Sequence, residues 1–457
     1  MKPQIVSFLL KRNRPIKNKK ISAKKTLRSF QRQVRSNGWY KTFLEKNRCS
    51  VSKIKSIGDF VNLVPLLSKE SVFNENSFSK LVKCNSHEIQ SVMLSSGQSG
   101  NFSTGIITRR ENRKLASQTD LYLDLLFGIK KGEALIINAS AMGVRVFTNH
   151  SCCNTGSRSD LVVTLLKKVS PSYSKTVISA DPHLIKQIVE DSIDAGVDWS
   201  KLKVWIISGG DWFPETLRKY VHTLTGKSAL NPENGFWAAI YGLTELGYPL
   251  FFETFQLASL RSKFCSNHEL YEDSLAFKQG RCTTPFLFHY LQLSFYLEQV
   301  IDENKVPELV FTTLAPSRVI PLVRYNTHDI GELLDHNAFD STTYKLPLVA
   351  FWGRNQNWLS LPSAKILITD IKELLFTDFE LNEKITGFFT LQNNHGKADL
   401  TVQLKKGKML STLEEERFIH LLHQFYPAEI NASFEKYHWF EQQMELDYEH
   451  KFNHLQA

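Results

Sequence analysis

The chain has 457 residues, of which 42% are hydrophobic and 22% charged, and its formal net charge is +10. This length is more than one ordinary domain needs, and the composition is that of a globular protein with a sizeable core. No apolar run approaches the roughly 18 residues of a membrane-spanning helix, and no signal peptide is recognisable. The six cysteines are sparse, which suits a reducing compartment, so we expect a cytoplasmic protein without disulfides.

Positive charge is concentrated in the stretch from Lys11 to Arg28. We assign residues 1–25 to a basic N-terminal arm. Such an arm is either simply solvated or attracted to a polyanion, for example a nucleic acid, a membrane surface or an acidic carrier protein. No aromatic side chains alternate with these charges, so the stretch does not favour a nucleic-acid platform.

Residues 26–84 carry apolar side chains at helical spacing and are predicted to be helical. From residue 134 onward, short buried strands alternate with helices. The clearest helix begins after Asp181, with Pro182 at its first position, and ends at Gly196. A strand at 203–208 then leads through two glycines into another helix near Pro214. In this α/β arrangement, ligands bind at strand carboxyl ends and helix N-termini.

After residue 308 the pattern changes from alternating strands and helices to short strands joined by tight loops. Three short strands are predicted, at 308–314, 319–325 and 331–334, and we expect them to form a small β subdomain. After about residue 354, a hairpin with its turn at 393–396 precedes a helix. Thr412 and Glu415 are expected to form the capping box of that helix. Its apolar face is predicted to comprise Phe418, Leu421, Leu422 and Phe425.

The stretch "SSGQSG" at residues 95–100 is too rich in glycine and serine for a helix or a packed strand. Consecutive backbone N–H groups in such a loop can surround a phosphate, although a surface turn is the alternative. Four further stretches follow: "ISGGD" at 207–211, "YGLTE" at 241–245, "RYNTHD" at 324–329 and "GR" at 353–354. In this order and spacing, the five resemble the adenylate-forming superfamily, and within it the phenylacetate–coenzyme A ligases, over residues 26–457.

The resemblance implies an α/β fold with two parts. Residues 26–353 would form a large adenylate-forming domain that binds ATP and the acid, with mixed sheets, helices and a small β subdomain. Residues 354–457 would form a small, mobile α+β domain. The implied reaction activates a carboxylic acid with ATP and Mg²⁺ to an acyl adenylate, and a thiol then displaces AMP. Coenzyme A is the expected thiol, and the aromatic richness favours an aryl or arylalkyl acid.

Alternatives to this function remain open. The acceptor could be a carrier protein or another group, and a degenerate member would bind a nucleotide without turnover. The expected partners are thus the acid, ATP and the acceptor, with a homodimer among the expected assemblies.

The resemblance also implies roles for individual residues. Tyr241 and Gly242 would lie against the adenine, Thr244 would bind the α-phosphate, and Glu245 would hold Mg²⁺. The β- and γ-phosphates would be bound by Ser95, Ser96, Gly97, Ser99 and Gly100. The remaining expected nucleotide contacts are Gly209, Gly210 and Asp211 at the adenine, Asp329 at the ribose hydroxyls, and Arg354 at the ribose or phosphate. Lys451 would contact the carboxylate and the α-phosphate during adenylation.

Several positions depart from the family's pattern. Gln98 stands where Ser or Thr is usual, Asn101 replaces a Lys, and Asn355 replaces an acidic hinge residue. His328 replaces a Gly, which is expected to require a different backbone geometry. Arg324 could be either a ligand or a structural salt-bridge residue.

Cysteine and histidine also cluster between residues 265 and 289. Cys265, His268, Cys282 and His289 have donor types that can hold Zn²⁺, and some family members carry a Cys/His pair here. Ordinary packing is the competing interpretation.

Overall fold

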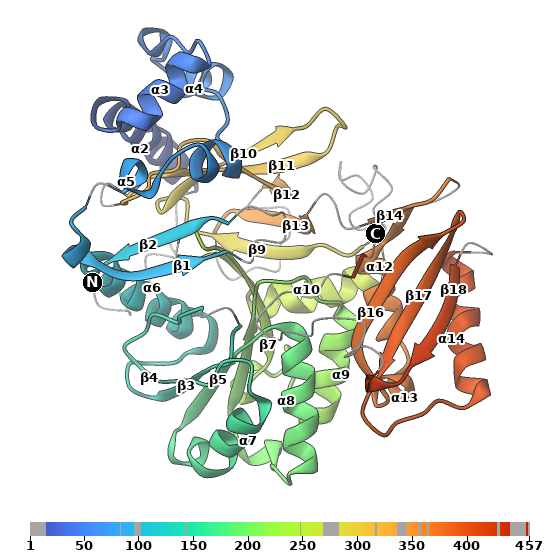
Figure 1. Cartoon of the computed structure of the whole chain (residues 1–457). Helices are drawn as coiled ribbons and strands as arrows, with labels where there is room; N and C mark the ends of the chain where they lie inside the picture. Colours follow the sequence, from blue (N-terminus) through green and yellow to red (C-terminus); the bar gives the residue numbers. More distant parts are fainter. Residues whose placement is uncertain are drawn as a thin grey trace. The chain divides into compact units, whose positions relative to one another are not determined.

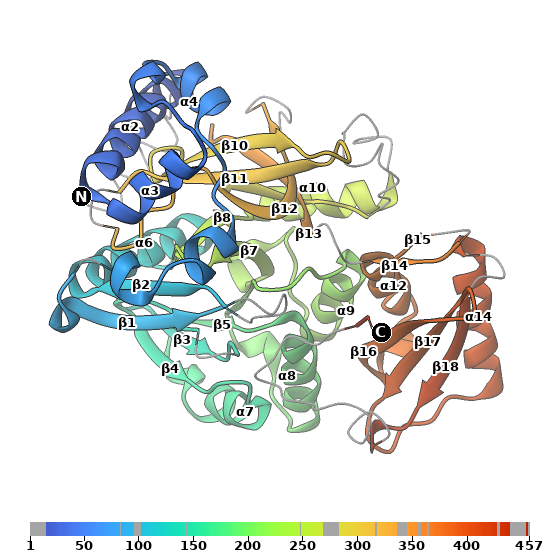
Figure 2. The same ribbon diagram turned by 45° about the horizontal axis from the view of Figure 1, so that its top comes forward.

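The computed structural model describes most of the chain in two compact units (Figures 1 and 2). The first unit comprises Met1–Gly132, Val146–His150 and Ala238–Gly353, and the second Glu133–Arg145, Ser151–Trp237 and Arg354–Ala457. The described residues are 15–82, 84–95, 102–141, 144–246, 248–267, 283–315, 318–335, 345–354, 358–362, 365–426, 430–438 and 454–455.

The first unit begins with helices, as predicted for residues 26–84. They are α2 (Pro15–Ser36), α3 (Gly38–Lys46), α4 (Ile57–Leu63) and α5 (Phe78–Leu81). Phe30 and Phe60 are fully buried between them, with ring centroids 5.6 Å apart in an edge-on contact. The helical region starts earlier than expected, because α2 runs without a break through the predicted end of the basic arm at residue 25.

A hairpin and a larger sheet complete this unit. Strands β1 (Ile89–Leu94) and β2 (Thr104–Thr108) are antiparallel and lead into helix α6 (Arg109–Phe127). The larger sheet has the strand order β10-β11-β12-β13-β9-β8-β7. The bounds are β7 (Trp237–Leu243), β8 (Tyr248–Phe252), β9 (Phe286–Tyr290), β10 (Phe295–Ile301), β11 (Pro307–Thr313), β12 (Tyr325–Leu334) and β13 (Leu348–Arg354).

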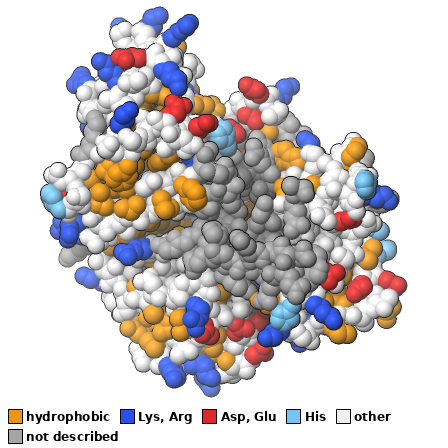
Figure 3. Space-filling model, viewed as in Figure 1, with side chains coloured by type: hydrophobic (Ala, Val, Ile, Leu, Met, Phe, Trp, Pro, Cys, Tyr) orange, Lys and Arg blue, Asp and Glu red, His pale blue; other side chains and the backbone are white. Residues whose placement is uncertain are grey.

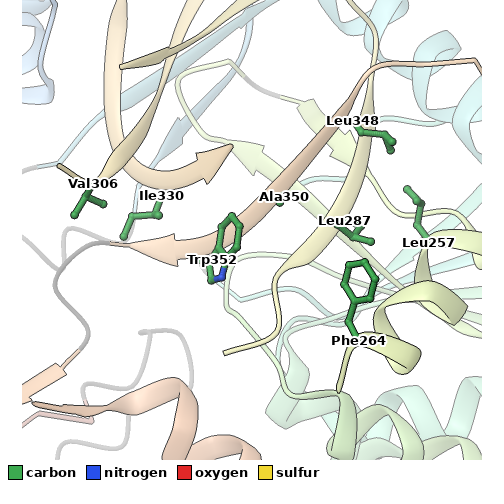
Figure 4. Packing of buried hydrophobic residues seen from close by; sticks show 8 residues of the cluster. All are labelled: Leu257, Phe264, Leu287, Val306, Ile330, Leu348, Ala350 and Trp352. Carbon is green, nitrogen blue, oxygen red and sulfur yellow. The ribbon is translucent and has the colours of Figure 1, made fainter. Parts of the chain in front are cut away.

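Helix α10 (Phe255–Ser266) covers part of this sheet. Its Leu257 and Phe264 pack toward Leu287 of β9, and Trp352 of β13 belongs to the same buried cluster (Figure 4). This apolar layer holds β12 and β13 in place, and these two strands carry several of the predicted site residues. Burying each such large side chain typically contributes about 1.5–3 kcal/mol.

One predicted strand of the small β subdomain is wrong. Residues 319–324 are not extended into a strand, and β12 instead runs from Tyr325 through the separately predicted stretch 331–334. The physical reason lies at two residues. Pro321 cannot donate a ladder hydrogen bond, and Arg324 has a left-handed backbone with φ of +52°.

The second unit contains a parallel sheet in the order β6-β5-β3-β4. Its strands are β3 (Ala134–Asn138), β4 (Ser151–Asn154), β5 (Lys175–Ser179) and β6 (Val204–Ser208), and its helices are α7 (Ser159–Lys168), α8 (Pro182–Asp194) and α9 (Glu215–Thr225). The prediction for α8 is confirmed: Asp181 is the N-cap, Pro182 is the first helical residue, and the apolar face is buried.

The same unit includes the C-terminal segment. Strands β16 (Ile385–Asn394) and β17 (Lys397–Leu404) form the predicted hairpin, β18 (Ile430–Glu435) pairs with β17 in parallel, and α14 (Thr412–Phe425) packs beside β18 (Figure 2). The remaining elements are β14 (Trp358–Ser360), β15 (Lys365–Leu367), α12 (Ile368–Leu375) and α13 (Phe379–Asn382).

The capping box of α14 lies one residue before the predicted one. The Ser411 side chain accepts from the Glu414 N–H, so Ser411 rather than Thr412 is the cap. On the predicted apolar face, Phe418 and Leu422 are buried, whereas Phe425 is 61% exposed. The fold is thus the predicted mixed α/β type. Within the described ranges, no helix is long and apolar enough to cross a membrane.

Candidate active site

Two predicted site residues from different strands meet inside the first unit. The hydroxyl of Tyr241, on β7, donates to Oδ2 of Asp329, on β12, over 2.5 Å. Both side chains are buried, and the Tyr241 ring stacks on Phe251 with centroids 4.9 Å apart. Because the ring is locked among phenylalanines, its hydroxyl orients the carboxylate of Asp329.

The turn after β7 holds the second pair. Oε1 of Glu245 accepts from the Tyr325 hydroxyl over 3.0 Å, and Tyr325 is the first residue of β12. The carbonyl of the next residue, Leu246, accepts from the Arg318 guanidinium. These contacts fix a buried carboxylate beside Thr244. Carboxylate oxygens are ligands that Mg²⁺ accepts together with phosphate oxygens, so Glu245 suits the predicted metal role.

A glycine on β2 makes a close approach to the same turn. A Cβ at Gly105 would lie 2.0 Å from the carbonyl oxygen of Thr244, so only glycine allows this close approach. At the base of the loop, Ser95 donates its N–H to the Ser103 carbonyl (3.0 Å), and its hydroxyl accepts from the Ser103 N–H (2.9 Å). Strand β2 of the hairpin therefore lies against Thr244, and Ser95 and Ser103 are paired at the end of the hairpin.

Replacing Gly105 by alanine is expected to destabilise the protein by about 1–3 kcal/mol, because the backbone at Thr244 must move away from the new methyl group. Gly58→Ala in α4 is the matched control, since its Cβ would contact only the Ser56 hydroxyl at 3.6 Å. Urea unfolding of both variants measures the difference. Equal stability of Gly105→Ala and wild type would contradict the close approach.

Arg324 is a structural salt-bridge residue, which is one of the two alternatives that the sequence left open. Its Nη2 lies 3.0 Å from Oε1 of buried Glu298, and its carbonyl accepts from the Leu67 N–H over 2.8 Å. The guanidinium also donates to the Val64 carbonyl. Arg324 thus ties the helical region to the sheet.

His328 does not need the altered backbone that we expected. Its φ is +56°, in the left-handed region that favours glycine. Its N–H donates to Oδ1 of Asn326 over 3.0 Å, and its Nδ1 lies 3.1 Å from Oε1 of Glu308. The interaction with Glu308 raises the pKa of His328. These bonds offset the strain, so Asp329 keeps its place after a non-glycine residue.

The "GGD" turn lies in the second unit, after β6. Gly210 has φ of +85°, which requires glycine. Oδ2 of Asp211 pairs with Nζ of Lys372, on α12, over 2.7 Å, and the Lys372 side chain is almost fully buried. Gly209, which has no side chain, precedes Gly210 in this turn. Asp211 is therefore anchored by the C-terminal segment.

The C-terminal segment has further contacts with α8 and α9 inside this unit. Glu190 of α8 accepts from Lys186 (2.6 Å) and Tyr220 (2.8 Å) and pairs with Lys405 of the C-terminal sheet (2.7 Å). Lys186 also donates to the Ile385 carbonyl over 2.8 Å. Burial lowers the pKa of Lys186 to about 7.

Other predicted residues are only partly described. Ser96, Gly97, Gln98, Ser99, Gly100, Asn101, Asn355 and Lys451 lie outside the described residues, as does the side chain of Arg354. His268 and Cys282 of the predicted zinc set also lie outside them. Of the other two, Cys265 lies 3.2 Å from the Thr284 hydroxyl, and His289 lies 3.4 Å from the Pro347 carbonyl. Among the described residues, no group of three or more His, Cys, Asp or Glu could hold a metal ion. The zinc site stays a prediction.

Sequence reasoning gave no role to Gly105, Tyr325, Arg318 or Lys372. For Tyr325 the strand period gave no signal, because β12 is irregular between Tyr325 and Asp329, where His328 has a left-handed backbone. No local signal pointed to Lys372, because its partner Asp211 is 161 positions away in the chain.

No protein-family model matches the chain, and no curated protein does. Solved structures do match. A 2-hydroxyisobutyryl-CoA ligase in the postadenylation state, in complex with R3-HIB-AMP, has a TM-score of 0.71 and 13% identity, covering 96% of this chain and 89% of that chain. An anthranilate CoA ligase in complex with anthranoyl-AMP has a TM-score of 0.51 and 12% identity, covering 76% of this chain and 64% of that chain. These likenesses show that the chain shares the fold of these CoA ligases.

Proposed function

We propose that this chain, with the fold of adenylate-forming ligases, activates a carboxylic acid with ATP and transfers the acyl group to a thiol. The observation that carries the proposal is the convergence in the first unit. Asp329 is oriented by Tyr241, and the turn with Thr244 and Glu245 lies against the hairpin of the predicted phosphate loop at Gly105. A scaffold without catalysis has no need for this combination of groups.

In this proposal, each group has a separate task. Asp329 accepts hydrogen bonds from the two ribose hydroxyls, since a carboxylate is well matched to a cis-diol. Thr244 donates to the α-phosphate, while backbone N–H groups of the Ser95–Gly100 loop bind the outer phosphates. Tyr241 and Gly242 would contact the nucleotide at its adenine end, and the resemblance gives Gly209, Gly210 and Asp211 an adenine contact as well. Arg354 approaches the ribose or phosphate.

The first half-reaction forms a bond between a substrate carboxylate oxygen and the α-phosphorus, and pyrophosphate leaves. Catalysis of this kind is chiefly positioning and charge stabilisation. Glu245, held by Tyr325, is the residue that would bind Mg²⁺, which supplies neutralisation of phosphate charge when bound. Lys451 stabilises the charge that develops on the α-phosphate.

The finer assignment of substrate and compartment rests on composition. The aromatic content of 12%, with 31 phenylalanines, favours an aromatic acid and a phenylacetate–coenzyme A ligase-like specificity. The sparse cysteines favour the cytoplasm. The replacement of the loop lysine by Asn101 is the observation that favours the second candidate, a nucleotide-binding member without turnover.

The test is exchange of labelled pyrophosphate into ATP over a broad panel of carboxylic acids with Mg²⁺. We expect exchange that depends on one class of acid, with aryl and arylalkyl acids the most active. Direct binding of ATP is measured alongside. ATP binding without exchange for any acid would contradict catalysis and support the second candidate, and absence of both would contradict the nucleotide site itself.

A further inference from the structure

The net positive charge of this protein comes from its N-terminal part. Twelve of the 56 Lys and Arg, and none of the 46 Asp and Glu, lie in residues 1–36. Residues 37–457 therefore carry 44 basic and 46 acidic side chains, which is close to balance. Such asymmetry indicates a dedicated interaction with a polyanion rather than a generally basic surface.

Helix α2 arranges eight of these charges. One face of the helix is buried against the rest of the first unit, where the Ser29 hydroxyl donates to the Thr313 carbonyl over 2.8 Å. The buried side chains of that face are Ser22, Thr26, Ser29, Phe30 and Gln33. The helix is thus fixed by packing, and its opposite face is exposed. In Figure 3, Lys and Arg side chains (blue) are prominent over this helical region.

Seven basic side chains share the exposed face. At 100° per residue they fall within an arc of about 140°, and they extend over about 27 Å of helix. We call this set the basic stripe; it comprises Lys17, Lys20, Lys24, Lys25, Arg28, Arg32 and Arg35. Four of them, Lys20, Lys24, Arg28 and Arg32, follow one another at four-residue spacing, which places a positive charge about every 6 Å along one line. Ile21, 36% exposed, lies within the stripe.

We propose that the basic stripe docks an acidic helix of a carrier protein whose pantetheine thiol accepts the acyl group. This rests on the proposed function. The thiol sulfur forms a bond to the acyl carbonyl carbon while the bond from that carbon to the adenylate oxygen breaks. AMP leaves with the electron pair of that bond, and the thiol proton passes to water.

Three observations favour this partner. A line of charges one helix wide matches carboxylates at i and i+4 on a partner helix, which repeat at the same spacing of about 6 Å. Exposed Ile21, toward the N-terminal end of the stripe, offers an apolar contact of the kind that protein interfaces bury. Free coenzyme A is too small to contact a stripe of this length. A carrier protein is a folded domain, and it needs a surface on the enzyme that binds the domain itself as well as its pantetheine.

The other polyanions fit less well. The stripe has no aromatic side chain on which a base could stack, as single-stranded nucleic acids require. An amphipathic helix that binds a membrane inserts its apolar face, but here that face is buried in the protein. Both remain as outcomes of the experiment below.

The test compares two variants that each reverse four charges. The first carries Lys20→Glu, Lys24→Glu, Arg28→Glu and Arg32→Glu in the stripe. The control reverses four exposed lysines elsewhere, Lys131, Lys219, Lys406 and Lys408. Binding of a fluorescently labelled acidic acyl carrier protein in its holo form is measured by anisotropy at several salt concentrations. Circular dichroism checks that α2 is retained.

For the stripe variant, we expect Kd for the carrier to rise at least about tenfold, with loss of the salt dependence. The control variant should bind as wild type does, and both should keep wild-type pyrophosphate exchange and wild-type transfer to free coenzyme A. Unchanged carrier binding in the stripe variant would overturn the proposal. So would tighter, stripe-dependent binding of an RNA oligonucleotide or of phosphatidylserine vesicles. Stripe-dependent carrier binding without any exchange would overturn the proposed function and leave the docking surface standing.

Discussion

Asp329→Ala is expected to lower kcat/KM for ATP in the exchange reaction by about 10²–10⁴-fold, because two hydrogen bonds from the ribose to a charged group are lost. Each such bond is worth about 1.5–3 kcal/mol, and each 1.4 kcal/mol corresponds to a factor of ten. Most of the effect should appear as a higher KM for ATP if the ribose contact is made equally in ground and transition states.

Stability changes must be separated from this effect. Asp329→Ala also removes the acceptor of the buried Tyr241 hydroxyl, which typically costs about 1–3 kcal/mol. Tyr241→Phe keeps the ring packed on Phe251 and removes only the hydroxyl that orients the carboxylate, so a smaller loss of about tenfold is expected. Adding Tyr241→Phe to Asp329→Ala should recover part of the stability but none of the activity. Wild-type ATP binding by Asp329→Ala would contradict the ribose role.

Lys451→Ala is expected to slow acyl-adenylate formation by about 10²–10³-fold, the effect of removing one donor that stabilises a transition-state charge. A single flexible cation suits this task, because charge develops on the α-phosphate oxygens only at that step. The second half-reaction, measured with a pre-made acyl adenylate and the thiol, should proceed at nearly the wild-type rate.

Lys436, just after β18, is a second lysine of the C-terminal segment that could take this role, and it provides the comparison. Lys436→Ala should leave both half-reactions unchanged. A large loss in Lys436→Ala together with an unaffected Lys451→Ala would transfer the role to Lys436. Equal losses in both half-reactions of Lys451→Ala would indicate a folding defect, which thermal unfolding would reveal.

Elements whose ends are marked by capping or turn residues could be predicted from the sequence. Helix α8 follows from Asp181, Pro182 and its apolar face, and the hairpin of β16 and β17 follows from alternation around a turn. The capping box of α14 was predicted one residue too late, because two adjacent positions were equally suitable as the cap. Ser411 and Thr412 are each followed by a glutamate three residues later, so the sequence contains two equivalent capping boxes, and the structure has the one formed by Ser411 and Glu414.

Other features of the sequence were ambiguous until the packing was known. The alternatives for Arg324 were decided by buried Glu298 of β10, and His328 keeps a left-handed backbone because Asn326 and Glu308 bind it. The charge of the N-terminal stretch was evident, but only the burial of one face of α2 shows that the charges form a line on a fixed helix.

By itself, the sequence determined the local elements, the charge asymmetry and the order of the motifs, because these depend on residues close together in the chain. Only the tertiary structure decided which groups meet. Tyr241 and Asp329 are 88 positions apart, and Gly105 is still farther from Thr244, so each contact depends on strand order and register. Burial then gives these pairings their effect, because hydrogen bonds shielded from water fix the carboxylates of Asp329 and Glu245 in single orientations.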